Sequence, residues 1–173
     1  MSRSKIVFAY QFLTLGGVEV VLKNRIQELE KRGIESRVLF LKEYGGSQLF
    51  EDLSDKTFIS DRQSEVEEFF AAFDPEWVVA IDTPHIFPWA SRAVSSARLA
   101  YEVHSPYALA LSFLLRRESL NRVLGVMVPS PSQGLVVRAL APRCPELKVV
   151  PNGLAELFLD PPKTDEVPEG PLV

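Results

Sequence analysis

Short runs of hydrophobic residues alternate along this chain with stretches whose hydrophobic positions recur every three or four residues. The short runs are rich in β-branched and aromatic residues, which is typical of strands covered on both faces. They predict strands at Lys5–Phe12, Ser36–Leu41, Lys56–Ile59, Trp77–Ile81, Leu99–Val103, Val123–Val128 and Lys148–Val150. Because strands that alternate with helices form parallel sheets, the pattern predicts an α/β three-layer domain. Its sheet is expected to be mostly parallel, with about six to seven strands and helices on both faces.

The stretches with helical spacing predict the connecting helices. In Gly17–Arg32 the hydrophobic side chains form one stripe and the charged ones face away, and Gly33 is a typical end signal. Further helices are predicted at Ser64–Phe73, Ser91–Ser96, Ala108–Arg117 and Ser132–Leu140. The Ser64–Phe73 helix should end at Asp74-Pro75, because a residue before proline disfavours the helical conformation.

The composition changes near the end of the chain. A length of 173 residues fits one domain, since domains span roughly 100–200 residues. Residues 161–173 are rich in proline and charged residues, which is typical of linkers. The last two of them, Leu172 and Val173, are apolar. We therefore expect a domain over residues 1–160, followed over residues 161–173 by a linker and the start of a second, missing domain.

Composition and charge exclude several classes of function. The net charge is −4 and the Lys and Arg residues are scattered, whereas a nucleic-acid binder is normally basic. The single cysteine, Cys144, excludes an internal disulfide and a cysteine-based zinc site. The two histidines lie far apart. We expect no nucleic-acid partner, no metal and no other cofactor, and the low cysteine content favours the cytoplasm.

One segment leaves membrane contact open. No stretch stays apolar over the roughly 20 residues that a bilayer span needs. The apolar run Ala108–Leu115 is followed by Arg116-Arg117. Either this is a core helix whose arginines favour its C-terminal dipole, or it lies on a membrane surface, which would place the protein at the inner face of the membrane.

The first predicted strand leads into a glycine loop, Thr14-Leu15-Gly16-Gly17-Val18-Glu19, that opens a helix. Ligands of parallel sheets bind at the carboxyl ends of strands, and the N–H groups and dipole of a helix N-terminus stabilise an anion such as phosphate. The loop is neither G-x-G-x-x-G nor a Walker loop, so it does not predict a dinucleotide or P-loop site. The alternative is a tight turn that needs glycine for its φ angle, with Glu19 merely complementing the helix dipole.

Other polar residues also follow predicted strands. His85 and His104 come after the strands Trp77–Ile81 and Leu99–Val103, at the edge where a ligand would bind. Ser130 is followed by Pro131, a pattern typical of a helix N-cap rather than of a nucleophile. Asn152 lies in Pro151-Asn152-Gly153, which predicts a tight turn.

In order along the chain, four segments resemble motifs of the retaining glycosyltransferases of family 4, which have the GT-B fold of two Rossmann-like domains. The segments are Gly16-Gly17-Val18-Glu19, Val103-His104-Ser105, Val128-Pro129-Ser130 and Lys148-Val149-Val150-Pro151-Asn152-Gly153. The resemblance covers Lys5 to about Phe158. It implies the Rossmann-like, acceptor-binding N-terminal half of such an enzyme, inactive as an isolated fragment because the donor-binding domain is missing.

The resemblance also implies roles for individual residues. Gly16 and Gly17 would approach the diphosphate of a nucleotide-sugar donor that binds mostly through the missing domain. His104 would act in catalysis, by hydrogen-bonding the transferred sugar or by stabilising charge near the anomeric carbon. The loops would hold a sugar, lipid or small-molecule acceptor, and the family works without a catalytic metal. Further substrate-binding candidates are Glu19, His85, Ser130 and Asn152.

Two alternatives from other classes stay open. One is half of a GT-B nucleotide-sugar epimerase, which needs several carboxylates and a histidine that converge; Asp82 and Glu102 are its candidates. The other is a non-catalytic Rossmann-like binding module, because a fold does not settle a function. A receiver-like domain is excluded, since it needs an acidic cluster after the first strand, where this chain has Tyr10-Gln11.

Overall fold

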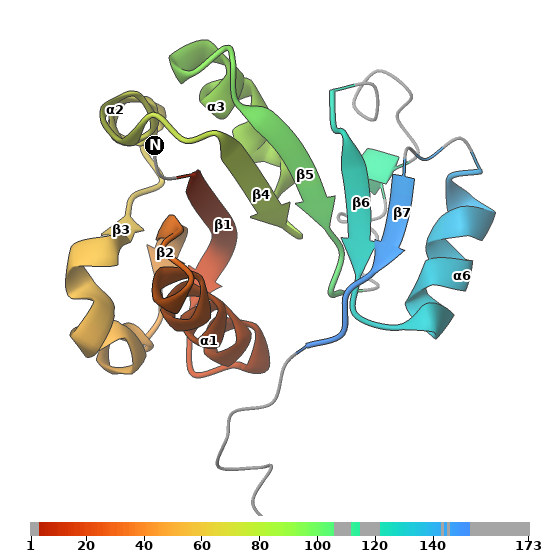
Figure 1. Ribbon diagram of the computed structural model, residues 1–173, viewed down its shortest axis with the longest axis horizontal. Helices are drawn as coiled ribbons and strands as arrows, with labels where there is room; N and C mark the ends of the chain where they lie inside the picture. The colour runs from red at the N-terminus through yellow and green to blue at the C-terminus, as the bar shows by residue number, and fades with distance from the viewer. Residues whose placement is uncertain (1–3, 106–111, 115–121, 143, 145, 153–173) are drawn as a thin grey trace, which may run out of the picture.

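A seven-stranded sheet forms the centre of the part of the chain that the computed structural model describes, with neighbouring strands parallel throughout (Figure 1). The described residues are 4–105, 112–114, 122–142, 144 and 146–152. The strands are β1 (Lys5–Leu13), β2 (Glu35–Glu43), β3 (Thr57–Ile59), β4 (Trp77–Ile81), β5 (Arg98–Glu102), β6 (Gly125–Val128) and β7 (Glu146–Val149), in the spatial order β3-β2-β1-β4-β5-β6-β7. The predicted fold class is therefore confirmed.

Helices cover both faces of the sheet and build a hydrophobic core on each. On one face lie α1 (Gly17–Lys31) and the 3₁₀ segment η1 (Ser47–Lys56). On the other lie α2 (Gln63–Phe73), α3 (Phe87–Ala93) and α6 (Pro131–Leu140), with the short 3₁₀ turn η2 (Pro84–Ile86) before α3. Strand residues alternate between the two cores: Phe8 packs under α1, whereas Val7 and Ala9 pack on the opposite face. This double burial explains why the strands appear as continuous hydrophobic runs in the sequence.

Two predicted elements differ from the structure. The bounds of the helix expected at Ser91–Ser96 are wrong, because α3 already begins at Phe87 and ends at Ala93. Pro88 does not prevent this early start, since proline is tolerated in the first turn of a helix. The 3₁₀ segment η1 begins at Ser47, the last residue of the loop expected at Tyr44–Ser47, and the sequence analysis predicted no helix there.

Some predictions fall on residues that the structure does not describe. Residues 112–114 are helical, and the remainder of the predicted helix Ala108–Arg117 lies outside the described residues. The linker predicted over residues 161–173 also lies outside them. Among the helices that are described, none has the length and hydropathy needed to cross a bilayer.

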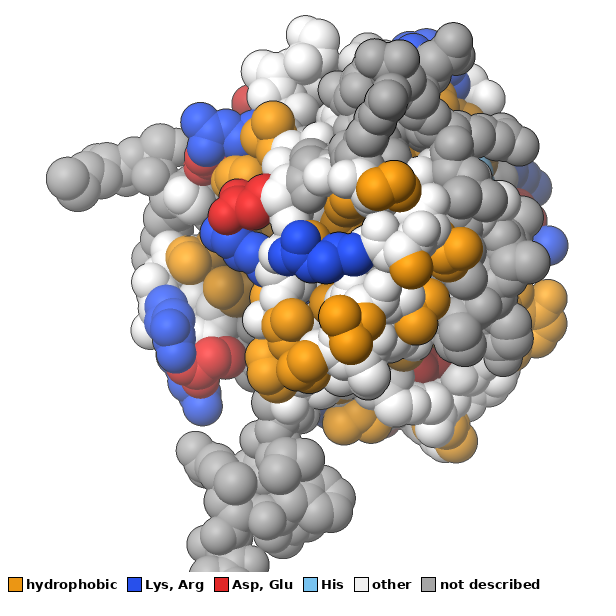
Figure 2. Space-filling view, turned by 90° about the vertical axis from the view of Figure 1, so that its right-hand side faces the viewer, with side chains coloured by type: hydrophobic (Ala, Val, Ile, Leu, Met, Phe, Trp, Pro, Cys, Tyr) orange, Lys and Arg blue, Asp and Glu red, His pale blue; other side chains and the backbone are white. Residues whose placement is uncertain are grey.

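The far edge of the sheet carries exposed hydrophobic side chains. Figure 2 faces this edge, where α6 and β7 lie, and shows hydrophobic side chains scattered over it. The exposed hydrophobic residues of the two elements are Leu135, Val136, Leu140 and Val149. This surface is distinct from the carboxyl edge of the sheet, where the sequence motifs gather.

The loops that follow β1 and β2 pack directly against each other. The N–H of Tyr44 donates a hydrogen bond to the carbonyl of Leu13 at 2.8 Å. Gly46 is buried against the backbone of the first loop, and a Cβ added there would lie 2.7 Å from the carbonyl carbon of Leu13 and collide with the carbonyl oxygen of Thr14. The loop after β2 therefore packs against the glycine loop before α1 and supports it.

Candidate functional site

The carboxyl ends of β1, β4, β5 and β6 lie side by side at one edge of the sheet, because these strands are neighbours and parallel. The glycine loop and the start of α1 follow β1 at this edge, and the segments with Asp82, His104 and Ser130 follow the other three strands. Such an edge is where parallel α/β sheets bind their ligands.

The N-terminus of α1 is open. The first intrahelical hydrogen bond runs from the N–H of Val20 to the carbonyl of Gly16 at 3.3 Å, so the N–H groups of Gly17, Val18 and Glu19 have no partner within the helix. Within the described residues, no side chain makes a capping hydrogen bond at the N-cap, Gly16. A Cβ added to Gly17 would have no atom within 4 Å, so the approach to these N–H groups is clear on that side. The positive end of the helix dipole and these N–H groups, which have no partner within the helix, together favour the binding of an anion.

At Gly16 a close contact with neighbouring side chains, rather than the φ angle, disfavours a larger residue. Its φ of −91° and ψ of 174° are open to any residue, so the predicted alternative of a turn that needs glycine for φ is wrong. A Cβ at Gly16 would instead lie 2.7 Å from Oε2 of Glu19 and 3.1 Å from Oγ1 of Thr14. The buried Glu19 carboxylate accepts hydrogen bonds from the Thr14 N–H, at 2.8 Å, and from the Thr14 hydroxyl. Glu19 thus braces the glycine loop in addition to lying in the positive first turn.

A buried charged cluster lies at the end of β5. Glu102 is fully buried, and the guanidinium of Arg25, which reaches across from α1, donates to its two carboxylate oxygens at 2.6 and 2.7 Å. Nε2 of His104 lies 2.6 Å from Oε1 of the same carboxylate. The cluster therefore joins α1 to the strand that precedes the predicted histidine.

The backbone of His104 is held from both sides. Asp82, which follows β4 with a left-handed φ of 48°, accepts hydrogen bonds from the N–H groups of His104 (3.0 Å) and Ser105 (2.9 Å). The side-chain amide of Gln133, in the first turn of α6, donates to the carbonyl of His104 at 2.7 Å. Two neighbouring segments thus fix the backbone of this one residue.

The two carboxylates of the site differ in their electrostatics. Burial by itself raises the pKa of Glu102, but the hydrogen bonds from His104 and Arg25 and the charge of Arg25 outweigh burial and hold the pKa below its ordinary value. Burial raises the pKa of Asp82 above its ordinary value, although the N–H groups of His104 and Ser105 counteract it. Glu102 is therefore an ionised structural anion at neutral pH.

The lowered pKa of Glu102 predicts how stability depends on pH. A carboxylate whose pKa falls on folding stabilises the fold above its unfolded pKa of about 4.3, and this contribution is lost as the pH falls through the lowered folded value. Glutamine resembles the protonated acid, so we expect Glu102→Gln to be less stable than the unsubstituted chain at about pH 7 and to differ much less at about pH 3. Urea unfolding at both pH values measures this difference.

The matched control for the pH dependence is Glu28→Gln, which removes a carboxylate from the exposed pair with Arg32 on α1. We expect this change to alter stability little at either pH. A stability difference for Glu102→Gln that is as large at low pH as at neutral pH would contradict the assigned ionisation.

The remaining predicted site residues are placed as follows. Ser130 is the N-cap of α6, as the sequence predicts: its hydroxyl accepts a hydrogen bond from the N–H of Gln133 at 3.3 Å. His85 is exposed to solvent in η2 and its ring stands edge-on to Trp89 with centroids 6.0 Å apart, and partial desolvation by neighbouring protein atoms lowers the pKa of the ring. Within the described residues no hydrogen bond joins His85 to His104. Asn152 is exposed, and the next residue of its predicted turn lies outside the described part.

Sequence reasoning missed two members of the site. Arg25 appeared only as a charged residue on the outer side of a predicted helix, although it faces Glu102. Gln133 carried no signal beyond its place three residues after the predicted N-cap, and that spacing does not indicate a contact with His104. Glu102 was named only as a candidate for an epimerase. Arg25 lies 77 positions from Glu102 and Gln133 lies 29 positions from His104, so these two pairings become visible only in the folded chain.

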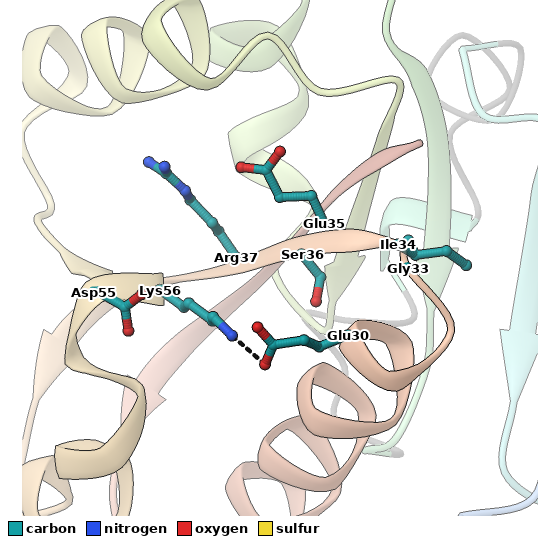
Figure 3. Close-up of a pocket in the computed structure, with 8 residues that line it drawn as sticks. All are labelled: Glu30, Gly33, Ile34, Glu35, Ser36, Arg37, Asp55 and Lys56. Atoms are coloured by element: carbon teal, nitrogen blue, oxygen red, sulfur yellow. Dashed lines mark ion pairs between the residues drawn. The ribbon is translucent and has the colours of Figure 1, made fainter. Parts of the chain in front are cut away.

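The described residues hold no group of three or more His, Cys, Asp or Glu side chains that fits a metal ion. A pocket lies at the opposite, amino end of β2, where the buried hydroxyl of Ser36 lacks a hydrogen-bond partner and points toward the ion pair of Glu30 and Lys56 (Figure 3). The pocket is lined by Glu30, Gly33, Ile34, Glu35, Ser36, Arg37, Asp55 and Lys56. It is separate from the site at the carboxyl edge.

Comparisons with known proteins relate this fold to glycosyltransferases. No protein-family model and no curated protein matches the chain. Among solved structures, it is similar to HepE from Anabaena, in complex with UDP and glucose, with a TM-score of 0.66 and 18% identity over 88% of this chain and 45% of HepE. It is also similar to an α-glucosyltransferase in complex with UDP-glucose and DNA containing an abasic site, with a TM-score of 0.62 and 13% identity over 89% of this chain and 44% of that one. The chain thus spans less than half the length of either protein, and its fold is that of one half of a GT-B glycosyltransferase.

Proposed function

We propose that this chain is the acceptor-side half of a retaining, family 4-like glycosyltransferase that moves a sugar from a nucleotide-sugar donor. The diphosphate of the donor binds at the N-terminus of α1, and His104 meets the transferred sugar. The observation that carries this proposal is the combination, at one edge of a GT-B-like fold, of an uncapped helix N-terminus with a histidine held on three sides.

The chemistry of glycosyl transfer suits such an edge. The departing diphosphate gains negative charge, which prearranged N–H donors and a helix dipole stabilise without reorganisation. A sugar held in one orientation reaches its transition state at a smaller entropic cost, and a rigidly anchored His104 provides such a hold. HepE was solved with UDP and glucose, and the α-glucosyltransferase with UDP-glucose, which makes UDP-glucose a reasonable first probe for this chain.

Gly17→Val tests the diphosphate site. A Cβ at Gly17 would have no atom of the described residues within 4 Å, so we expect the fold to persist, whereas the added bulk should obstruct the N–H groups at the helix N-terminus. We expect UDP-glucose to bind the unsubstituted chain weakly and to shift the amide resonances of Gly17 and Val18 in NMR titrations. The variant should bind about tenfold more weakly or worse, a loss of about 1.4 kcal/mol or more.

The matched control is Ala71→Val, which adds a side chain to the exposed side of α2, on the opposite face of the sheet. It should leave the titration unchanged. Shifts in the unsubstituted chain that spare the start of α1, or equal affinities for the Gly17→Val chain and the unsubstituted one, would refute the diphosphate site.

A second candidate function is half of a nucleotide-sugar epimerase, because two carboxylates and an imidazole do converge here. However, both oxygens of Glu102 accept from Arg25 or His104, and both oxygens of Asp82 accept backbone N–H groups. Carboxylates engaged in this way are poorly placed to exchange protons with a substrate. The geometry therefore supports the transferase better.

The proposal also implies that the chain alone does not turn over. Donor contacts lie mostly in the other half of a GT-B enzyme, so we expect negligible sugar transfer from UDP-glucose by the purified 173-residue chain. A radiolabel transfer assay with a panel of sugar and lipid acceptors measures this. Sustained multiple turnovers would contradict the assignment of the chain to one half of the enzyme.

A further inference from the structure

The two ring nitrogens of His104 lie in different environments. Nε2 is 2.6 Å from Oε1 of Glu102, and the imidazole and the carboxylate are only 7% and 1% exposed. In the part of the chain that the structure describes, the hydrogen bonds of His104 involve Nε2 and its backbone groups, and none reaches Nδ1.

Glu102 determines which of these nitrogens carries the proton. An ionised carboxylate has no hydrogen to donate and only accepts. At this distance from Oε1, Nε2 must therefore be the donor. In the neutral ring the other nitrogen, Nδ1, then has a free lone pair and acts as a hydrogen-bond acceptor.

Arg25 keeps the carboxylate in place and balances its charge. The planar guanidinium donates to both oxygens of Glu102, which fixes the carboxylate more firmly than a single contact would. The charges of Arg25 and Glu102 compensate each other, so the carboxylate is not an unpaired anion inside the fold.

We infer that Glu102, held by Arg25, is a positioning residue that fixes His104 as its Nε2–H tautomer and leaves Nδ1 to accept a hydrogen bond from a hydroxyl group of the ligand. A sugar hydroxyl meets this requirement, whereas an ionised phosphate oxygen, itself an acceptor, does not. Of the two roles that the family resemblance implies for His104, this selects hydrogen bonding to the sugar. The identity of the ligand rests on the proposed function, but the tautomer is a property of the free chain.

Long-range ¹H–¹⁵N NMR of the imidazole rings tests the inference. The chain has two histidines, so His85 is an internal reference and a His85→Gln variant assigns the spectrum. In the free chain, under basic conditions where imidazoles are neutral, we expect His104 to populate only the Nε2–H tautomer. Glu102→Gln should lose this single tautomer, because the side-chain amide offers both an acceptor and a donor and can pair with either form.

Glu76→Gln is the matched control, since Glu76 forms an exposed pair with Arg98 at the amino end of β5. It should leave the His104 tautomer unchanged. A free chain with the Nδ1–H tautomer or a mixture overturns the inference, and so does a folded Glu102→Gln chain that keeps a single Nε2–H tautomer. The tautomer of His104 is measured on the unsubstituted chain, so this result tests the inference even if the Glu102→Gln chain does not fold.

Addition of UDP-glucose separates this inference from the proposed function. If the Nδ1 resonance of His104 shifts and its Nε2 resonance does not, the result supports both the tautomer inference and the proposed function. The expected tautomer combined with an unmoved Nδ1 resonance, at a concentration that saturates the shifts of the α1 amides, confirms the positioning role and counts against His104 as the sugar contact.

Discussion

Arg25→Met is expected to destabilise the chain by about 3–5 kcal/mol, the usual cost of removing one partner of a buried ion pair. The carboxylate of Glu102 is 1% exposed, so the loss of Arg25 leaves a charge without its main counterion inside the fold. The cost arises from this stranded charge rather than from lost packing, since methionine retains much of the length of the arginine side chain. Urea unfolding at neutral pH measures the change in the free energy of unfolding.

Two further variants show whether the effect of Arg25→Met comes from the buried ion pair. Arg32→Met removes an arginine from the same helix, but from an exposed pair with Glu28, and should change stability little. The double variant Arg25→Met with Glu102→Gln removes both charges and should recover a large part of the stability lost in Arg25→Met. If Arg25→Met proved as mild as Arg32→Met, the buried pair would not be a main link between α1 and β5.

Gly46→Ala is the other substitution with a large expected effect. A Cβ at this position collides with the backbone of Thr14 and Leu13, which cannot move aside as the end of a flexible side chain can. We expect a loss of about 1–3 kcal/mol or more, together with displacement of the glycine loop. Thermal unfolding and the amide spectrum of the α1 N-terminus measure both effects.

Gly17→Ala is the matched control for Gly46→Ala, because a Cβ at Gly17 has no atom within 4 Å. Its stability should be close to that of the unsubstituted chain. Equal stabilities for the two alanine variants would mean that the loops after β1 and β2 do not support each other.

Local patterns predicted the elements that depend on local physics. The strand Trp77–Ile81 was predicted with its observed bounds, because a strand buried on both faces is a continuous hydrophobic run. The start of α6 was predicted to within one residue, since the N-cap Ser130 and Pro131 act through contacts within one turn. The start of α3 was missed because a proline-rich stretch predicts a loop, although proline is also tolerated in the first turn of a helix.

The candidate site was predictable only in part. The position of His104 after its strand was visible in the sequence, because parallel strands all present their carboxyl ends at one edge. The partners that orient it were not, because Arg25 and Glu102 lie 77 positions apart and their pairing depends on how α1 crosses the sheet. The same holds for Gln133, 29 positions from the carbonyl it contacts. The close contact at Gly16 was likewise not predictable, because it depends on the Glu19 side chain turning back toward Thr14 in the folded chain.

The functional account depends above all on the diphosphate site at the start of α1, and a crystal structure of the chain with bound UDP tests it most directly. The account predicts phosphate oxygens of UDP within about 3 Å of the N–H groups of Gly17 and Val18. Phosphates bound elsewhere, for instance at the amino-end pocket beside Lys56, with the start of α1 left empty, would contradict it.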